Sequence, residues 1–408
     1  MHTTLRGLGW LVCGILFASP ALSQVKFAYI DPLSGGAASA GINAQKHMTY
    51  LVDRLNAAGG LAGQKVELLS YDNKVDPQES LIALKKALDD GARYVFQGNG
   101  SAVALAITDA VLKYNERNPG KEVLYFNYAA VDPALTNDKC NFWHFRFDAD
   151  ADMKMAALTD VIAKDQNIKN VYLIDQDYSF GRAVAAAARR MLAVKRPDIK
   201  IVGDELHPLQ KIQDFSPYVA KIKASGADTV ITGNWSNDMF LLLKAGKDAG
   251  LKVNWYTYYA GALGSPSAIG RDGVGYVKQV SEYHNNALPD LDPDAAAFKK
   301  RFTGKDDEFD YYRLKTTFDM LAAAATAAKS NEPIKVAKAL EGMKLMTTVG
   351  EAEMRADNHQ ILQPMFVSTF SENVKYDVEK TGFGFKTDAK VNAKDTAQPT
   401  TCKMQRPS

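Results

Sequence analysis

Residues 97–104, "QGNGSAVA", place two glycines and a serine at the start of an apolar helix. Gly98 and Gly100 supply the first half of the G-x-G-x-x-G dinucleotide fingerprint, but Val103 stands where the third glycine would close the helix onto the strand. Half of the fingerprint is weak support for a nucleotide site. The free N–H groups of the first helical turn can still hold a small anion, with Ser101 either capping the helix or donating its hydroxyl.

Motifs of common enzymes and metal sites are missing from the chain. It has no P-loop, no H-E-x-x-H zinc motif and no G-x-S-x-G nucleophile elbow, and its six histidines show no ligand spacing. We therefore predict a protein without enzymatic activity, metal ion or cofactor. The remaining enzyme hypothesis is a dehydrogenase that uses the turn at Gly98 and Gly100.

Small, polar and aromatic residues recur where predicted strands end, which is the edge at which open α/β sheets bind ligands. They are Leu33, Ser34, Ser101, Ala102 and 129–131 in the first part of the chain, and 178–180, Asn234, Trp235, Tyr258 and Tyr259 in the second. Phe180 and Trp235 could equally be core residues. Because Tyr258 and Tyr259 alternate along a predicted strand, we expect only Tyr259 to face the site.

The elements that position these residues alternate as strand and amphipathic helix, which predicts an α/β fold with mostly parallel sheets. The first run has strands at 25–30, 65–72, 93–98 and 122–129, with helices at 43–58, near 81–88 and from Ser101. The second run has helices at 153–163, 182–194, 218–224 and 238–249, with strands at 170–175, 199–206, 228–233 and 252–258. Two such runs predict two similar, doubly wound lobes.

The last third of the chain is too sparse in elements for a third domain. It contains a long helix near 311–329, a shorter one near 334–343, a strand-like segment at 363–370 and a polar tail from Lys386 that we expect to be irregular. We expect these segments to complete both lobes by crossing between them.

The overall composition is that of a globular chain. Of 408 residues, 46% are hydrophobic and 24% are charged, with a net charge of +2 and no long basic run, which excludes a nucleic-acid partner. Residues 1–23 combine one arginine, an apolar stretch and Ala-Leu-Ser before Gln24, which predicts a cleavable secretory signal peptide. Cys140 and Cys402 then remain, and in an exported chain they either pair or stay as inert thiols.

The order of the segments resembles the solute-binding proteins of branched-chain amino acid ABC transporters, the Leu/Ile/Val-binding family with the type I two-lobed fold. The resemblance is carried by "DPLSGGAASAG", "NAAGGLAGQKVELLSYDNKVDP", "AAVDPALT", "DQDYSFGRA", "ADTVITGNWSNDMFLLLKAGKDAGL" and "DNHQILQPMFV", which span nearly all of the exported chain. It implies three hinge crossings, with lobe 1 at 24–147 and 277–362 and lobe 2 at 148–276 and 363–408. It also implies a periplasmic protein that hands a small molecule to a membrane permease, and we expect a monomer.

The resemblance also implies roles for single residues. Ser101 matches the serine that holds the ligand's carboxylate, where the helix dipole contributes roughly 0.3 to 2 kcal/mol. Ala129 keeps its place, but Val131 replaces a threonine, Phe180 a tyrosine and Tyr259 an acid of the amino-acid binders. Since a buried ammonium without a counter-charge costs several kcal/mol, we expect a ligand without an α-amino group, in a pocket with nothing to neutralise one.

The sequence therefore predicts an exported solute-binding protein for a small carboxylate, with aromatic or other apolar acids favoured by the aromatic side chains. The predicted ligand-binding residues are Ser34, Ser101, Ala102, Ala129, Val131, Tyr178, Phe180, Trp235 and Tyr259. Two hypotheses of the same fold stay open, namely a branched-chain amino acid binding protein and a ligand sensor that signals to a membrane receptor.

Overall fold

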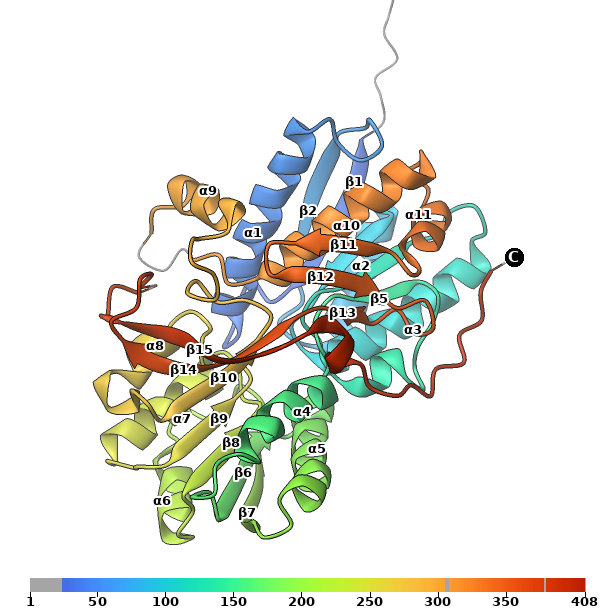
Figure 1. The fold of residues 1–408 in the computed structure, drawn as a ribbon. Coiled ribbons are helices and arrows are strands. Elements are labelled where there is room, and N and C mark those ends of the chain that lie inside the picture. Colours follow the sequence, from blue (N-terminus) through green and yellow to red (C-terminus); the bar gives the residue numbers. More distant parts are fainter. Residues whose placement is uncertain (1–23, 305–307, 378, 408) are drawn as a thin grey trace, which may run out of the picture.

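The computed structural model describes residues 24–304, 308–377 and 379–407, so the predicted signal peptide at 1–23 lies outside the described residues. One lobe is built on the N-terminal part of the chain and the other on its middle, while the last third contributes to both (Figure 1). No helix in the described ranges is long and apolar enough to cross a membrane.

Lobe 1 is built on a five-stranded parallel sheet. Its strands are β1 (Val25–Asp31), β2 (Val66–Asp72), β3 (Tyr94–Gln97), β4 (Leu124–Asn127) and β5 (His144–Arg146). Its first helices are α1 (Ala38–Ala57), α2 (Pro77–Asp89) and α3 (Ser101–Arg117), followed by the 3-10 helix η1 (Pro133–Thr136). The strand order β2-β1-β3-β4-β5 reverses between β1 and β3. Ligands of such sheets bind beside this reversal, and α3 begins there.

Lobe 2 is built on a seven-stranded sheet in the order β15-β14-β10-β9-β8-β6-β7. Its strands are β6 (Asn170–Gln176), β7 (Lys200–His207), β8 (Thr229–Thr232), β9 (Asn254–Thr257), β10 (Val277–Ser281), β14 (Met365–Glu372) and β15 (Phe383–Val391). Its helices are α4 (Ala151–Ile162), α5 (Ser179–Lys195), α6 (Ser216–Ala224), α7 (Asn237–Asp248), α8 (Ser265–Ile269) and η2 (Arg271–Gly273). Among the described residues, the antiparallel pairs of this sheet are those of β14 with β10 and with β15, and the other pairs are parallel. The predicted α/β architecture is confirmed.

The last third of the chain adds helices and a small sheet to lobe 1. They are α9 (Pro293–Arg301), α10 (Tyr312–Ala328), α11 (Pro333–Leu340), β11 (Lys344–Thr347), β12 (Gly350–Met354) and β13 (Ile361–Leu362), and the 3-10 helix η3 (Ala393–Thr396) follows β15. The ring of Phe318 in α10 lies 5.4 Å from that of Phe96 in β3, so α10 belongs to the core of lobe 1.

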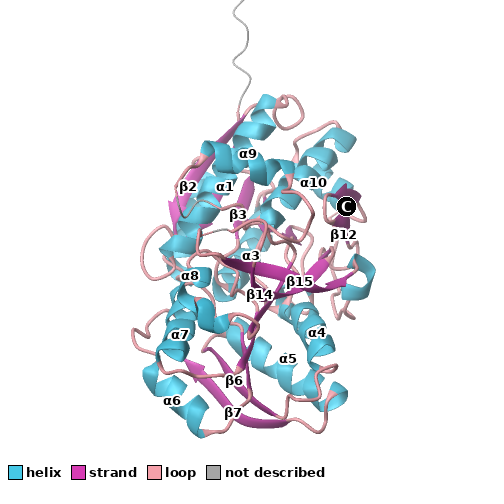
Figure 2. Ribbon diagram, turned by 60° about the vertical axis from the view of Figure 1, so that its left-hand side comes forward, coloured by secondary structure: helices cyan, strands magenta, loops and turns pink. Residues whose placement is uncertain are grey.

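The apolar pattern explains why these elements form. In α1 the buried residues Met48, Leu51, Val52 and Leu55 recur at helical spacing, and the helix ends before Gly59, whose φ is +106°. Every residue of β3 and of β4 is buried, as is typical of central strands in a parallel sheet covered on both faces. Figure 2 shows helices packed around the sheets of both lobes.

Two segments lie elsewhere than the sequence analysis expected. β10 was assigned to lobe 1, but it pairs with β9, so the chain leaves lobe 2 after Ser281 and not before Val277. The tail from Lys386, expected to be irregular, continues as a strand to Val391, because β14 supplies a backbone partner along its whole length. Local sequence did not reveal either strand, since each depends on a partner distant in the chain.

The sequence analysis assigned the C-terminal tail to lobe 2 as part of 363–408, but after β15 the tail returns to lobe 1. Thr400 Oγ1 donates to the carbonyl of Thr136 at 3.1 Å, and Cys140 and Cys402 form a disulfide with their Cα atoms 5.7 Å apart. The end of the chain is therefore fastened across the lobe whose β3–α3 turn begins the candidate site.

Candidate functional site

The turn between β3 and α3 is closed by a carboxylate of the protein itself. The backbone N–H groups of Gly98 and Asn99 donate to Asp31 at 3.0 and 2.9 Å, and the Tyr128 hydroxyl donates to Asp31 at 2.5 Å. A Cβ on Gly98 would lie 2.8 Å from the Tyr128 ring, so the glycine is needed for this packing. Because these N–H groups are occupied, the turn is not a dinucleotide cradle.

The first turn of α3 has backbone N–H groups that are not used in hydrogen bonds within the described residues. The helix begins after Gly100, whose φ is +94°, and the N–H groups of Ser101, Ala102 and Val103 meet no acceptor among the described residues. Ser101 Oγ accepts from the N–H of Asp132 at 3.2 Å, which leaves the hydroxyl proton free to donate. The end of α3 can therefore bind an anion.

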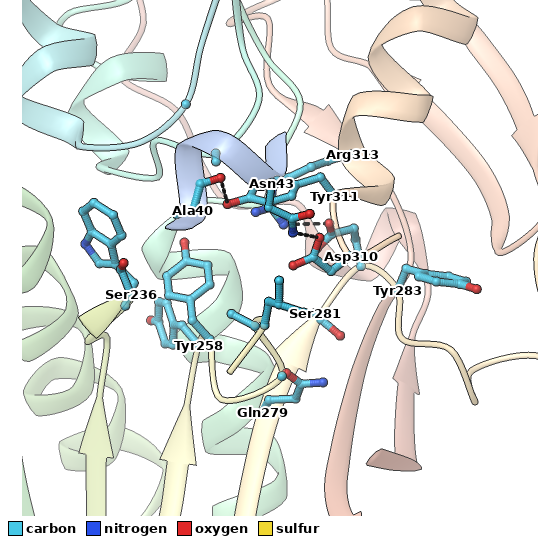
Figure 3. A pocket seen from close by; sticks show the side chains of 18 of the residues that line it. Ala40, Asn43, Ser236, Tyr258, Gln279, Ser281, Tyr283, Asp310, Tyr311 and Arg313 are labelled. Atoms are coloured by element: carbon cyan, nitrogen blue, oxygen red, sulfur yellow. Dashed lines mark hydrogen bonds and ion pairs between the residues drawn. The ribbon is translucent and has the colours of Figure 1, made fainter. Parts of the chain in front are cut away.

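A cavity lies between the two lobes at this end of α3. Its volume is about 130 Å³, whereas one enclosed water needs only about 10–15 Å³. Lobe 1 lines it with α1, the β3–α3 turn, the loop after β4 and the start of α10. Lobe 2 lines it with α4, the start of α5 and the segments after β8, β9 and β10 (Figure 3). The space fits a small organic molecule held by both lobes.

Most of the predicted ligand-binding residues meet at this cavity. Those that line it are Ser101, Ala129, Val131, Tyr178, Phe180, Trp235 and Tyr259. Ser34 and Ala102 are not among the lining residues. The Ser34 hydroxyl lies in an exposed turn and donates to Asp72 at 2.5 Å, so its neighbour on β2 determines its position. Ala102 lies half-buried one position beyond Ser101, on another side of α3.

Aromatic side chains of lobe 2 form one wall of the cavity. Trp235 Nε1 donates to the Tyr178 hydroxyl at 2.9 Å, and the ring of Phe180 lies 5.9 Å from those of Tyr178 and Tyr258. Tyr258 and Tyr259 both line the cavity, so the expectation that only Tyr259 faces it was wrong. β9 ends at Thr257, and strand alternation no longer governs the two residues that follow.

Charged residues that the sequence analysis missed also line the cavity. Arg313 Nη1 donates to Glu282 Oε1 at 2.8 Å, and Lys154 Nζ donates to Asp148 Oδ2 at 2.9 Å. Burial raises the pKa of Glu282, but Arg313 and Lys154 outweigh that effect and hold the pKa below its ordinary value. A signal was present for Lys154, because it occupies the buried face of α4 at apolar spacing.

The expectation of a cavity without a counter-charge for an ammonium was wrong. Glu282, Glu308 and Asp310 line it, and all three come from the last third of the chain, which was interpreted only as lobe crossings. Each already has a partner. Glu282 pairs with Arg313, Glu308 pairs with Lys299 at 2.8 Å, and Asp310 accepts from Asn43 Nδ2 at 2.7 Å. Burial raises the pKa of Asp310 to about 7, against the attraction of Arg313.

The lobes touch at the edge of the cavity. Ser236 Oγ, after β8, donates to the carbonyl of Gly36 at 3.4 Å and lies 3.5 Å from Ser39 Oγ in α1. Ser236 has a φ of +54°, which a residue other than glycine adopts only at a cost. The lobes are therefore in contact around the site.

Three comparisons with known proteins agree with this architecture. A family model described as "Periplasmic binding protein" matches residues 24–375. Leu/Ile/Val-binding protein homolog 4 of Brucella melitensis is 35% identical over 406 residues, which covers 96% of this chain and 95% of that protein.

Two solved structures are also similar. The closed Leu-, Ile-, Val-, Thr- and Ala-binding protein of Brucella ovis is 33% identical with a TM-score of 0.84, covering 94% of this chain and all of that one (100%). A solute-binding protein of Rhodopseudomonas palustris BisB5, in complex with 3,4-dihydroxybenzoic acid, has a TM-score of 0.77 at 19% identity, covering 91% of this chain and 98% of that one. At 19% identity the likeness concerns the fold alone.

Proposed function

Because this chain belongs to the periplasmic binding protein family, we propose that it binds a small carboxylic acid between its lobes and delivers it to the permease of an ABC transporter. The protein is a periplasmic solute-binding protein of this transporter class. Its relatives are named as binding proteins, which supports a binding role without catalysis. A sensor that presents the closed form to a membrane receptor is the alternative use of the same fold.

The observation that carries the proposal is the first turn of α3. Ser101 lines the cavity with a hydroxyl that is free to donate, and its backbone N–H, like those of Ala102 and Val103 in the same helical turn, meets no acceptor among the described residues. Charge-assisted hydrogen bonds from such donors are about twice as strong as neutral ones, and the helix dipole contributes roughly 0.3 to 2 kcal/mol more. A carboxylate should therefore bind here more strongly than any neutral group. We call the Ser101 hydroxyl and the backbone N–H groups of residues 101–103 the carboxylate seat.

The body of the ligand is proposed to be aromatic or otherwise apolar. Tyr178, Phe180, Trp235 and Tyr259 contribute rings to the cavity, and each favourable ring contact adds about 0.5–1.5 kcal/mol beyond burial. An α-amino group fits less well even though carboxylates are present, because an ammonium would compete with Arg313 for Glu282. Branched-chain amino acids, named for the relatives, are the alternative ligands.

A thermal-shift screen tests the ligand class. Benzoate and cyclohexanecarboxylate are compared with leucine, isoleucine and valine, and with benzamide as the matched neutral analogue. At a hundred times its dissociation constant a ligand adds about 2.7 kcal/mol of stability. We expect shifts with the two acids and none with benzamide. A larger shift with leucine would establish the amino-acid alternative. Equal shifts with benzoate and benzamide would contradict the proposed carboxylate seat.

A further inference from the structure

Four charged residues meet where the chain crosses between the lobes, and we call them the hinge cluster. They are Asp148, Lys154, Glu282 and Arg313. Asp148 lies in the first crossing, and Lys154 lies in α4, which follows it. Glu282 follows β10 at the second crossing, and Arg313 lies in α10 of lobe 1. Three of the four, all but Asp148, line the cavity.

The hinge cluster is buried and its charges balance. Exposure is 0% for Asp148, 1% for Lys154, 3% for Glu282 and 8% for Arg313. The two cations face the two anions, with Arg313 Nε 3.7 Å from Asp148 Oδ2 as the third contact. An additional full charge would find no unpaired counter-charge here, so the hinge cluster suits a neutral polar group of a ligand.

Hydrogen-bonding positions stay open in this cluster. Arg313 uses Nη1 for Glu282, but Nη2 bonds to no described residue and Nε is buried without a hydrogen-bond partner. The second carboxylate oxygen of Glu282 accepts from no other described residue. The pair therefore offers the unused N–H donors of Arg313 and one unused acceptor oxygen of Glu282, on residues that line the cavity.

Aromatic rings separate the hinge cluster from the start of α3 on the lobe 1 side. The guanidinium of Arg313 lies 4.6 Å from the centre of the Tyr311 ring, which lies 5.7 Å from the ring of Tyr128. The Tyr128 hydroxyl accepts from Asn99 Nδ2 at 3.1 Å, two residues before α3 begins. Figure 3 shows Arg313 and Tyr311 on the side of the pocket away from Ser236.

Aromatic rings of lobe 2 also lie beside the hinge cluster. Lys154 Nζ lies 4.9 Å from the centre of the Tyr259 ring, and Phe180 lies 6.2 Å from Tyr259 and 5.9 Å from Tyr178. The cavity is thus lined by Ser101, by the hinge cluster and by aromatic side chains, of which Tyr259 and Tyr311 contact the hinge cluster.

We propose that the hinge cluster binds a hydroxyl group at the end of the ligand remote from its carboxylate, so that the ligand is a hydroxy acid. A hydroxyl both donates and accepts, and it can donate to Glu282 while it accepts from Arg313. An ammonium only donates and would lie beside the guanidinium, whereas a second carboxylate only accepts and would lie beside Glu282. The inference rests on the carboxylate seat proposed above.

Titration calorimetry with substituted benzoates tests the inference. The ligands are benzoate, 3-hydroxybenzoate, 4-hydroxybenzoate, 4-(aminomethyl)benzoate and terephthalate. We expect one hydroxybenzoate to bind about ten-fold or more tightly than benzoate, because a buried site that hydrogen-bonds a hydroxyl discriminates strongly against its absence, and the charged analogues to bind more weakly than benzoate. Equal affinity for benzoate and both hydroxybenzoates would overturn the inference and leave the carboxylate seat intact. If no acid binds, the proposed seat itself fails.

Two variants locate the hydroxyl at the hinge cluster. Glu282→Gln exchanges an acceptor oxygen for a donor, and Arg313→Lys keeps the charge but removes the second guanidinium nitrogen. We expect each to reduce the ratio of hydroxybenzoate to benzoate affinity at least five-fold, with folding checked by thermal unfolding without ligand. Glu205→Gln is the control, because Glu205 pairs with Lys221 outside the cavity. A ratio that persists in the folded variants would place the hydroxyl elsewhere and contradict the proposal.

Discussion

The carboxylate of Asp31 accepts a hydrogen bond from the backbone N–H of Gly98 at 3.0 Å and so fastens the end of β1 to the turn before α3. Lobe 2 repeats the relationship, since Asp175 at the end of β6 accepts from the N–H of Gly233 after β8 at 2.6 Å. In both lobes a buried aspartate of one strand fixes the loop that follows its neighbour. In lobe 1 this leaves the donors of the first turn of α3 free for a ligand.

The role of Ser101 can be measured by removing its hydroxyl. Ser101→Ala should weaken the binding of benzoate by about 1–3 kcal/mol, because a buried charged acceptor loses one donor. Titration calorimetry measures the change. Ser34→Ala is the matched control, since Ser34 lies in an exposed turn bonded to Asp72 and does not line the cavity. Equal affinities of the Ser101 variant and the wild type would leave the serine as a structural residue only.

The preference for aromatic acids should depend on Phe180. Its ring is 2% exposed and lies 5.9 Å from those of Tyr178 and Tyr258. Phe180→Leu keeps the apolar surface but removes the ring, so we expect benzoate to lose about 0.5–1.5 kcal/mol relative to cyclohexanecarboxylate. Affinities of both acids for both proteins provide the comparison. A parallel loss for the two acids would show that Phe180 supplies packing without ring recognition.

The buried carboxyl of Asp175 should make stability depend on pH. Burial raises its pKa from 3.8 to about 8, although the N–H of Gly233 opposes the shift. Between about pH 4 and pH 8 the folded state therefore holds a proton that the unfolded chain has lost, so the free energy of unfolding falls as pH rises through this window. Asp175→Asn keeps an acceptor for Gly233 but cannot titrate. Its urea-unfolding free energies should fall less between pH 5 and pH 8 than those of the wild type, and identical slopes would contradict the assignment.

The disulfide between Cys140 and Cys402 should contribute to stability but not to binding. It closes a loop with a sequence separation of 262 residues, and removing such a cross-link lowers the free energy of unfolding by about 2–5 kcal/mol. Cys402→Ser should reproduce the effect of a reductant on the thermal unfolding of the wild type and should itself no longer respond to the reductant. Neither cysteine lines the cavity, so ligand affinity should not change.

Local pattern in the sequence predicted much of the fold. The alternation of apolar strands and amphipathic helices predicted two mostly parallel sheets and the start of α3 at Ser101, because burial of a continuous apolar face determines those elements. It also brought Phe180 and Trp235 to the correct edge of the lobe 2 sheet. Predictions failed where the environment of a residue comes from a distant segment. Ser34, for example, is held by Asp72 of β2. Tyr258 was missed for a local reason, because its strand ends at Thr257.

The hinge cluster is a clearer example of residues whose environment comes from distant segments of the chain. Asp148, Lys154, Glu282 and Arg313 come from three parts of the chain that meet only when the lobes are assembled. None of them belongs to a short motif, and apart from Lys154, which stands at apolar spacing in α4, their burial is evident only from their partners. Asp310 escaped notice for the same reason, since its partner Asn43 lies in α1.

A crystal structure of the protein with 4-hydroxybenzoate tests the central claim most directly. We predict the carboxylate within hydrogen-bonding distance of Ser101 Oγ and of the backbone N–H groups that begin α3, with the ring among the aromatic side chains of lobe 2. A carboxylate bound away from α3, or a ligand outside the space between the lobes, would contradict the account.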